Sequence, residues 1–434
     1  MDLENICKDI KRLLLYYKAH IALMAPSSRT GAGYLYQYTN CRILRNGKII
    51  REDLWVRNGV IMNPEILFYV EKVSADQKID CKNLIIAPGF IDVQINGGFG
   101  FDFSTDTNIE KSLQKVAFGI LAHGVTSFCP TIITSTPNFY HKILPGIKKC
   151  SGSEMGAGVL GAHLEGPFIS PDRNGAHPKQ CIKSYDNGFV DVLDMYGDLS
   201  NVALVTLAPE KQNSLQVIEE LCKRGIVVSL GHSSANLLEG EEAVRSGAKF
   251  ITHLFNAMLP FHHRDPHLVG LLTSEKLPRN RQVFYGIIAD GIHTHPAALR
   301  IAHRVHPKGT VLVTDAIQAM GLPDGTYPFG EQTIVVEGKY SYIKDTKTLA
   351  GSMATLDTCV RLFAKQTGCG PELALEAASL HPAQLLGIED RKGTLNFDSD
   401  ADFVLLDDDL NVKATYIAGK CVYQYKDYVH SPTN

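Results

Sequence analysis

Residues 158–177 read Gly-Val-Leu-Gly-Ala-His-Leu-Glu-Gly-Pro-Phe-Ile-Ser-Pro-Asp-Arg-Asn-Gly-Ala-His, and the fold is best worked out from this stretch. An apolar run up to Leu164 ends in a carboxylate, Glu165, and Gly166-Pro167 then interrupts regular structure. A short run that is apolar on both faces is typical of a buried strand in a parallel sheet. A charge at the end of such a strand is costly unless it is paired or binds a metal ion. Glu165 is therefore either a partner in a salt bridge or a metal ligand.

Three later segments repeat this pattern of an apolar run followed by a polar residue. The runs 226–231, 250–252 and 311–314 end in His232, His253 and Asp315. If the four strand ends converge, Glu165 and the two histidines leave one coordination position open, as catalytic divalent sites require. Asp315 would then lie beside the metal-bound water as a general base. Taken singly, each histidine would more often be structural, and Asp315 would be the N-cap of the next helix.

In the middle of the chain, apolar strand candidates alternate with helical stretches. Helical character is clear in residues 215–224, 237–246 and 297–306. Eight β/α units over roughly 250 residues or more predict an α/β fold, a (β/α)8 TIM barrel. Active sites of this fold lie at the C-terminal ends of the strands, where all four polar residues named above fall. The eight strand candidates are residues 85–95, 124–133, 158–165, 202–208, 225–232, 249–255, 282–289 and 310–316.

Both ends of the chain are rich in short strand-like runs. Asn46-Gly47 and Asn58-Gly59 separate apolar runs near the N-terminus, and this dipeptide is the strongest short signal for a β-hairpin because both residues tolerate positive φ. Similar runs recur at residues 392–395, 402–406, 414–417 and 420–423. We expect the two ends to pair as one small β-sandwich. The predicted domains are an N-terminal extension of residues 1–33, a β-sandwich of residues 34–87 plus 388–434, and a catalytic TIM barrel of residues 88–387.

Composition excludes several classes of protein. The 434 residues carry a net charge of −3, from 43 basic and 46 acidic side chains, so no overall field favours nucleic acid or an anionic membrane as a partner. The ten cysteines form no C-x-x-C pair, which is typical of free thiols in a reducing compartment and predicts a cytoplasmic location. The apolar run at 13–24 is too short to span a bilayer.

Six motifs stand in order along the chain. They are Pro88-Gly-Phe-Ile-Asp-Val-Gln-Ile-Asn-Gly-Gly, His163-Leu-Glu-Gly-Pro, Ser229-Leu-Gly-His-Ser, Thr252-His-Leu-Phe-Asn-Ala-Met, Ala289-Asp-Gly-Ile-His and Val313-Thr-Asp-Ala. These motifs resemble the amidohydrolase superfamily and, within it, the animal form of the N-acetylglucosamine-6-phosphate deacetylase family. The resemblance runs from about residue 36 to about residue 423 and leaves residues 1–33 outside. It implies a hydrolase that converts N-acetylglucosamine 6-phosphate and water to glucosamine 6-phosphate and acetate.

The resemblance also implies roles for matching residues. Glu165, His232 and His253 would bind the metal, Asp315 would move the proton, and His177 would polarise the acetyl carbonyl. Arg264 would reach the phosphate across a subunit interface, which implies a homodimer. The implied substrate-binding residues are Ala176, His177, Asn256, Ala257, Arg264, Asp290, Gly291, Ile292, His293, Leu349, Ala350 and Gly351.

Some alternatives stay open. Arg264 could instead form a surface salt bridge with Asp265, and the adjacent His262 and His263 are expected to be loop or interface residues. Many superfamily members hold a second metal with His-x-His after the first strand, whereas residues 94–96 here read Gln-Ile-Asn. Amides are poor ligands beside imidazole, so we expect one divalent cation per subunit, with zinc suiting the ligands. The rival functions are cyclic-amide hydrolysis or deamination, and a non-catalytic interaction barrel.

Overall fold

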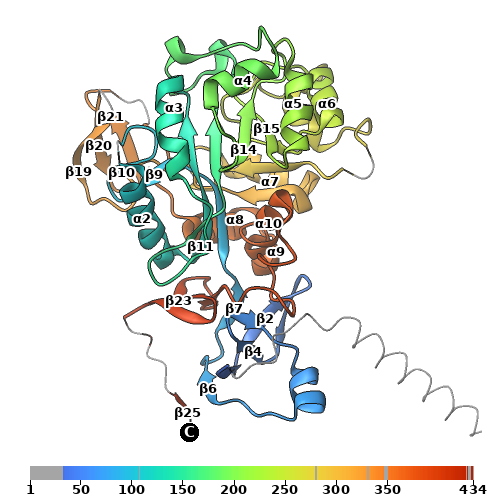
Figure 1. Ribbon diagram of the computed structural model, residues 1–434, viewed down its shortest axis with the longest axis vertical. Helices are drawn as coiled ribbons and strands as arrows, with labels where there is room; N and C mark the ends of the chain where they lie inside the picture. Colours follow the sequence, from blue (N-terminus) through green and yellow to red (C-terminus); the bar gives the residue numbers. More distant parts are fainter. Residues whose placement is uncertain are drawn as a thin grey trace, which may run out of the picture. The chain divides into compact units, whose positions relative to one another are not determined.

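A barrel of parallel strands forms the centre of the molecule, as predicted (Figure 1). The computed structural model describes residues 33–106, 108–278, 281–329, 332–346, 350–426, 428 and 432–433. Within them, each barrel strand pairs in parallel with the next one along the chain, and almost every strand residue is buried, which is why the strands are apolar on both faces. The strands are β8 (Phe90–Ile95), β11 (Val125–Ile133), β13 (Ala162–Glu165), β14 (Val202–Leu207), β15 (Val227–Leu230), β16 (Phe250–Ile251), β17 (Phe284–Ile287) and β18 (Thr310–Leu312).

The barrel closes at a seam between β8 and the residues that follow β18. The backbone N–H of Asp315 donates to the carbonyl oxygen of Gln94 at 2.9 Å. Beside it, the hydroxyl of Thr314 donates to a carboxylate oxygen of Asp92 at 2.6 Å. These contacts place the first and last strands side by side, so the side chains at their ends share one mouth.

Helices flank the barrel (Figure 1). The three predicted helical stretches are confirmed to within one residue at each end. Helix α6 begins with a capping box, in which Asn236 and Glu239 exchange hydrogen bonds with each other's backbone N–H. No helix among the described residues is both long and apolar enough to cross a bilayer. The α-helices are α2 (Ile109–Gly119), α3 (Pro137–Ile143), α4 (Phe189–Tyr196), α5 (Ser214–Lys223), α6 (Leu237–Ser246), α7 (Pro296–Val305), α8 (Leu356–Thr367), α9 (Gly370–Glu376) and α10 (Leu380–Leu386).

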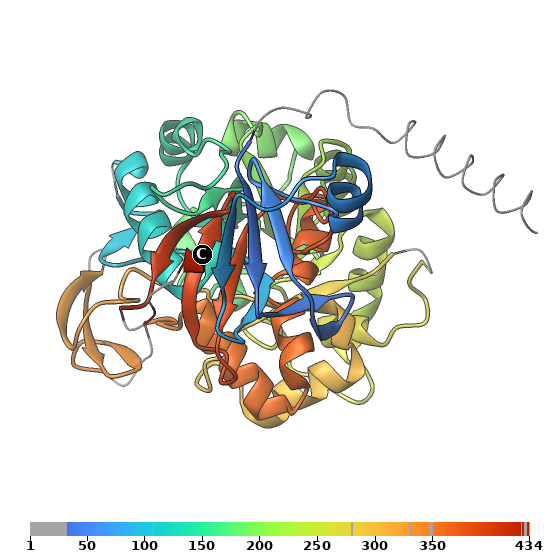
Figure 2. The ribbon, with the colours of Figure 1, turned by 90° about the horizontal axis from the view of Figure 1, so that it is seen from below.

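The strands from both chain ends pack as a sandwich, as expected, and lie side by side in Figure 2. The two sheets meet through a core in which the rings of Phe403 and Tyr416 stack at 4.5 Å, with Tyr38 edge-on to both. One sheet contains β1 (Leu35–Thr39), β4 (Leu54–Arg57), β5 (Val60–Ile61), β6 (Gln77–Asp80) and β25 (Pro432–Thr433). The other contains β2 (Arg42–Arg45), β3 (Lys48–Arg51), β7 (Ile85–Pro88), β22 (Phe403–Leu406), β23 (Val412–Ile417) and β24 (Lys420–Gln424).

The local predictions for the sandwich are confirmed in part. Asn46-Gly47 and Asn58-Gly59 have positive φ throughout and join β2 to β3 and β4 to β5 as hairpins. The strand expected at 392–395 is wrong. Lys392 donates its backbone N–H to Ile388 and its side chain to Asp402, so this segment extends the turn after α10. The proposed domain boundaries stay predictions, and the expected extension lies almost wholly outside the described residues.

Some small elements were not expected from the sequence. A three-stranded antiparallel sheet of β19 (Gly325–Phe329), β20 (Gln332–Glu337) and β21 (Tyr340–Ile343) is inserted after β18. A two-stranded ribbon of β9 (Gly97–Gly98) and β10 (Phe101–Asp102) follows β8. The strand predicted at 158–165 is interrupted, with β12 (Gly158–Val159) as a separate short strand before β13. The insertion brings Ala350 close to the mouth, since Ala350 donates its backbone N–H to Ser341 and the next residues bridge to Ala316.

Candidate metal centre and active site

Three side chains converge at the C-terminal ends of their strands. Glu165 is the last residue of β13, whereas His232 and His253 each lie two residues beyond the ends of β15 and β16. The Nε2 atoms of the two histidines lie 3.0 Å apart, and each faces Glu165 Oε1, at 3.2 Å for His232 and 3.0 Å for His253. The strands approach this closely because residue 231 is glycine. A Cβ atom there would lie 2.6 Å from Cβ of Thr252.

The hydrogen bonds of His232 indicate a cation site. Its Nδ1 lies 2.8 Å from the carbonyl oxygen of Arg173, and a carbonyl can only accept, so Nδ1 carries the hydrogen. In the neutral ring, Nε2 then presents a lone pair to Glu165 and His253. Such electron-pair donors repel one another unless a positive charge lies among them. Nitrogen and oxygen ligands at the usual 2.0–2.2 Å from Zn2+ stand about 3.3–3.6 Å apart in a tetrahedral site, so this donor set fits a divalent cation after a small outward shift of the side chains.

The pKa values of the cluster agree with that fit. Burial disfavours the charged form of Glu165, but its hydrogen bonds with His232 and His253 outweigh burial and hold its pKa well below the ordinary value. Burial likewise disfavours a charged His253, yet the neighbouring Glu165 raises the pKa of this imidazole to about 9. Both shifts favour a positive charge between the carboxylate and the two rings, which is the charge that a divalent cation bound there would supply.

Asp315 lies at the seam of the same mouth and is held by amides. Asn96 Nδ2 donates to Asp315 Oδ1 at 2.7 Å, and Gln94 Nε2 lies within reach of both Asp315 and Glu165, at 3.3 and 3.0 Å. Burial of the carboxylate, followed by the negative charge of Glu165, raises the pKa of Asp315 to about 6. The residue keeps part of its surface accessible. A carboxylate with this pKa can both take and return a proton near neutrality.

His177 points a hydrogen-bond donor toward the same centre. Its Nδ1 lies 2.7 Å from the hydroxyl of Thr134 and 3.3 Å from the backbone N–H of that residue, which can only donate. Nδ1 is therefore an acceptor, and the hydrogen of the neutral ring sits on Nε2, 3.8 Å from Glu165 Oε2. Burial, reinforced by His232, lowers the pKa of His177 to about 3, so the ring stays neutral. Its N–H can donate to a substrate carbonyl.

A chain of polar side chains lies inside the barrel on the same strands. The ring of His163 joins Thr131 and Thr206, at 3.1 and 2.8 Å, and Thr206 continues to Thr252 at 2.8 Å. Thr252 then contacts Ser229 at 2.5 Å. Burial lowers the pKa of His163 to about 4, so this ring is also neutral. This chain, which we call the hydroxyl belt, links the strands that carry the three candidate ligands.

The predicted substrate-binding residues occupy neighbouring loops. Asn256 and Ala257 follow His253, and Ala257 accepts a hydrogen bond from the backbone of Ser233. Asp290 accepts from the backbone of Ile292 and His293 at 2.8 Å, and its second oxygen holds His293 Nδ1 at 2.6 Å. Ala176 is exposed next to His177, and Gly291 has φ +74°. Ala350 and Gly351 lie beside the segment after Asp315, whereas Leu349 lies outside the described residues.

Arg264 is not brought to the mouth by any contact within the described chain. Its side chain is exposed and forms no ion pair with the described residues. The alternative of a salt bridge with Asp265 is not realised, since that carboxylate accepts backbone N–H groups of Leu237 and His267. Adjacent His262 and His263 are exposed, with ring centroids 4.5 Å apart.

Sequence reasoning missed three features of this site. The carbonyl of Arg173 and the backbone of Thr134 fix histidine tautomers, and backbone groups leave no mark in a sequence. Asp92 is a buried carboxylate at the barrel seam. Burial raises its pKa to about 7, against the lowering effect of Thr314. The sequence does contain a signal for Asp92, because it is a charged residue within the apolar run 90–95.

The parallel barrel and this donor set define a class of protein, the barrel hydrolases that use a metal held by carboxylate and imidazole. Comparison with known proteins identifies the family. The profile of the Amidohydrolase family matches residues 85–422, and the chain belongs to this family.

Similar proteins agree with this assignment. N-acetylglucosamine-6-phosphate deacetylase from Homo sapiens is 62% identical over 390 residues, which cover 89% of this chain and 95% of the human protein. The enzyme of the same name from Danio rerio is 60% identical over 390 residues, covering 89% of this chain and 96% of that protein. Among solved structures, a mutant N-acetyl-D-glucosamine-6-phosphate deacetylase from Mycobacterium smegmatis, in complex with N-acetyl-D-glucosamine-6-phosphate, has a TM-score of 0.74 and 29% identity. The match covers 90% of this chain and 100% of that chain.

Proposed function

We propose that this chain hydrolyses the acetamido group of N-acetyl-D-glucosamine 6-phosphate, giving D-glucosamine 6-phosphate and acetate in amino-sugar catabolism. The observation that carries the proposal is the 62% identity, over nearly the full length of both chains, to an enzyme with this name. The site supports it, because a candidate metal centre, a carboxylate with a raised pKa and a neutral imidazole donor meet at one barrel mouth.

The chemistry follows from the positions of these groups. A divalent cation held by Glu165, His232 and His253 would acidify water and polarise the acetyl carbonyl. Asp315 accepts the proton of the attacking water as its oxygen bonds to the acetyl carbon. His177 donates its Nε2–H to the carbonyl oxygen as negative charge develops there. Asp315 then returns the proton to the departing nitrogen, the C–N bond breaks, and acetate and the free amine leave.

Recognition of the sugar phosphate is assigned to the loops around the mouth. Asn256 and Ala257 lie in the loop that follows His253. The backbone N–H of Asn256 is donated to the carbonyl oxygen of His253, so Ala257 would offer its backbone N–H to a phosphate and Asn256 its side-chain amide. Asp290–His293 and Leu349–Gly351 would line the sugar pocket, with Ala176 beside the acetyl group. Arg264 is the planar donor suited to a phosphate. Its exposed guanidinium, without an ion pair among the described residues, supports an action across the interface of a homodimer.

The proposal includes one zinc ion per subunit. The amide groups of Gln94 and Asn96 turn their nitrogens to Asp315, which supports hydrogen bonding and not ligation of a second metal. The free thiols at the described cysteines support a cytoplasmic location.

Acetate release tests the reaction. The purified protein is assayed with N-acetylglucosamine 6-phosphate, unphosphorylated N-acetylglucosamine and a cyclic amide, before and after chelation and after return of Zn2+. We expect turnover of the phosphorylated sugar alone, lost on chelation and restored by Zn2+. Metal analysis should give one ion per chain. Turnover of the cyclic amide with an inert sugar phosphate would overturn the assignment.

Subunit mixing tests the role of Arg264. Arg264→Ala and Asp315→Asn should each inactivate the protein through different residues of a shared site. If Arg264 acts across the interface, a mixed dimer contains one intact site. Unfolding and refolding the two variants together should therefore recover about a quarter of the normal activity, because half the dimers are mixed and each has one site of two. No recovery from dimers shown to be mixed would place Arg264 in its own subunit's site.

A further inference from the structure

Glu210 holds the residues that follow the metal ligand His232. It lies three residues beyond the end of β14, and both of its carboxylate oxygens are used. Oε2 accepts the hydroxyl hydrogen of Ser233 at 2.7 Å, and Oε1 accepts the backbone N–H of Ser234 at 2.7 Å. A carboxylate with two short hydrogen bonds to adjacent residues fixes both the position and the direction of that segment.

The held segment has a backbone that needs support. His232 has φ +48°, in the left-handed region that residues other than glycine seldom occupy. The hydroxyl of Ser233 also accepts the backbone N–H of Ala235 at 2.9 Å, so this one side chain is bonded on two sides. Strain at a ligand persists only where neighbouring contacts over-determine it. Glu210 supplies two of those contacts.

The same segment connects the metal centre to two loops of the substrate site. The backbone N–H of Ser233 donates to the carbonyl oxygen of Ala257 at 3.1 Å, and residues 233 and 258 form an isolated parallel bridge. On the other side, Ser170 donates its backbone N–H to the carbonyl oxygen of His232 at 2.8 Å. The loop from residue 170 leads to His177. Displacement of Ser233 would therefore move a metal ligand and the Asn256–Ala257 loop together.

We propose that Glu210 is a positioning residue of the metal centre, which acts through Ser233 and Ser234 to set the His232 ring and the loop expected to receive the phosphate. The inference rests on the metal centre and reaction proposed above. Among the described residues, Glu210 forms no hydrogen bond with a predicted ligand or substrate residue, so its effect passes through the two serines.

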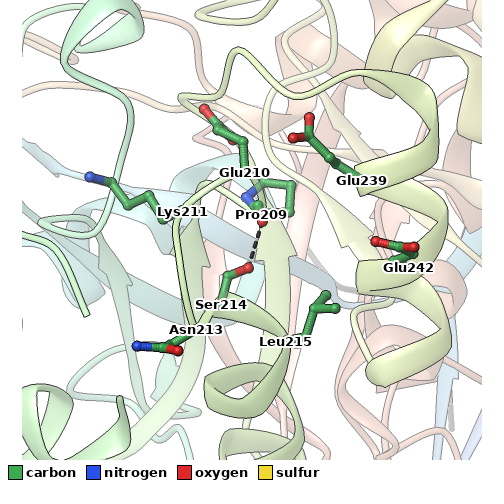
Figure 3. Close-up of a pocket in the computed structure, with 8 residues that line it drawn as sticks. All are labelled: Pro209, Glu210, Lys211, Asn213, Ser214, Leu215, Glu239 and Glu242. Atoms are coloured by element: carbon green, nitrogen blue, oxygen red, sulfur yellow. Dashed lines mark hydrogen bonds between the residues drawn. The ribbon is translucent and has the colours of Figure 1, made fainter. Parts of the chain in front are cut away.

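The surroundings of Glu210 provide a matched control. Glu210 lines a hollow of about 310 Å3 on the outer side of the segment, together with Lys211, Glu239 and Glu242 (Figure 3). Glu242 belongs to α6 and is exposed, and its carboxylate has no hydrogen bond or ion pair with the described residues. Glu242→Gln thus removes the same charge from the same hollow without touching the segment. Glu239 is unsuitable because it caps α6.

The test measures Zn2+ affinity by competition with a chromophoric chelator, which needs no turnover and so separates this inference from the proposed reaction. Glu210→Gln and Ser233→Ala should each weaken Zn2+ binding by about 10–100-fold, the usual effect of losing a partner behind a ligand. Glu242→Gln should stay within about twofold of the unaltered protein. Because part of the effect of Glu210 passes through Ser233, the loss in the double variant should be smaller than the product of the two single losses.

Two further readouts distinguish positioning from general stability. With Co2+ as the bound probe, the visible spectrum should change in Glu210→Gln and Ser233→Ala but not in Glu242→Gln. The KM for the phosphorylated sugar should rise more than kcat falls, since the Asn256–Ala257 loop moves with Ser233. If Glu210→Gln fails to fold, Ser233→Ala carries the test alone. Zn2+ affinity within about twofold of the Glu242→Gln control, or fully multiplicative losses in the double variant, would overturn the proposal.

Discussion

Two carboxylates at the barrel mouth have different surroundings: Glu165 lies beside imidazole rings, and Asp315 lies beside side-chain amides. On the imidazole side, Glu165 is buried among His232 and His253, and hydrogen bonds with these rings hold its pKa well below the ordinary value despite burial. On the amide side, Asp315 is approached by Asn96 and Gln94, which carry no charge, and its pKa rises to about 6. Asp315 also keeps an accessible surface, whereas Glu165 does not.

This difference supports the proposed division of tasks between the two carboxylates. A group that binds a cation must stay ionised, and the rings around Glu165 ensure that. A group that moves protons works best with a pKa near the working pH, and the uncharged amides leave that of Asp315 raised. Two titratable groups with pKa values pushed apart identify the acid–base partner. In the proposed mechanism, the Gln-x-Asn sequence at the end of the first strand would therefore support the base in place of a second metal.

The largest effect should come from removing the carboxylate charge of Glu165 on the imidazole side. Glu165→Gln removes the charge that two imidazoles surround, so we expect Zn2+ affinity to fall by more than the roughly 100-fold that marks loss of an outer partner. Acetate release should drop to background even when excess Zn2+ is supplied. Metal content by mass spectrometry of the desalted protein checks this. Retention of one Zn2+ per chain by the variant would contradict the ligand assignment.

A substitution of Asp315 on the amide side should leave the metal bound. Asp315→Asn keeps the shape of the side chain but cannot accept the proton, so kcat should fall by about 10²–10⁴-fold, the usual contribution of a general base. Zn2+ content and binding of the phosphorylated sugar should match those of the unaltered protein. Single-turnover kinetics and titration with the sugar measure both. A variant that loses its metal, or that turns over at a near-normal rate, would contradict the division of tasks.

A smaller change should appear in the pH profile. Asp315 must be ionised to act, so kcat/KM should fall tenfold per unit as the pH drops below an apparent pKa at or under about 6, since a bound cation lowers the pKa further. The hydrogen bond from Asn96 lowers this pKa. Asn96→Ala should therefore move the acidic limb to higher pH, with little change at pH 8. If the acidic limb of the kcat/KM profile stays at the same pH in Asn96→Ala, then Asn96 does not lower the pKa of Asp315.

Much of the fold could be predicted because its signals are local or periodic. Apolar runs of the length of a strand, separated by helical stretches, indicated the barrel, and the Asn-Gly pairs indicated the hairpins. The segment at 392–395 misled because its apolar and polar residues alternate only briefly, while a tertiary contact of Lys392 with Asp402 decides its path. The seam at Asp92 depends on the meeting of two strands over 200 residues apart along the chain, which no local pattern encodes.

In the candidate site, the identities of the ligand residues could be predicted from the sequence, but their orientations could not. Glu165, His232 and His253 could be predicted because each follows a buried strand, and the structure brings all three together. Their orientation could not, since it depends on the carbonyl of Arg173 and on the backbone of the loop that Glu210 holds. The resemblance implied a role for Arg264, but the proposed action from a neighbouring subunit lies outside what the geometry of one chain can show.

The smallest effect should come from a substitution in the hydroxyl belt, which links the strands that carry the three candidate ligands. Thr206→Val removes one hydroxyl of this belt and preserves the shape of the side chain. His163 and Thr252 would each lose a buried partner, so the free energy of unfolding should fall by about 1–3 kcal/mol. The control is Ser127→Ala, because the buried hydroxyl of Ser127 has no partner among the described residues and its removal should cost almost nothing. Urea unfolding of chelator-treated protein measures both, which keeps metal binding from masking the difference. If the belt only supports the strands, Thr206→Val should leave the acidic limb of the kcat/KM profile at the same pH. The belt would then affect the free energy of unfolding, whereas the amides beside Asp315 affect the pH profile. Equal stability of the two variants would show that the belt does not hold the ligand-bearing strands.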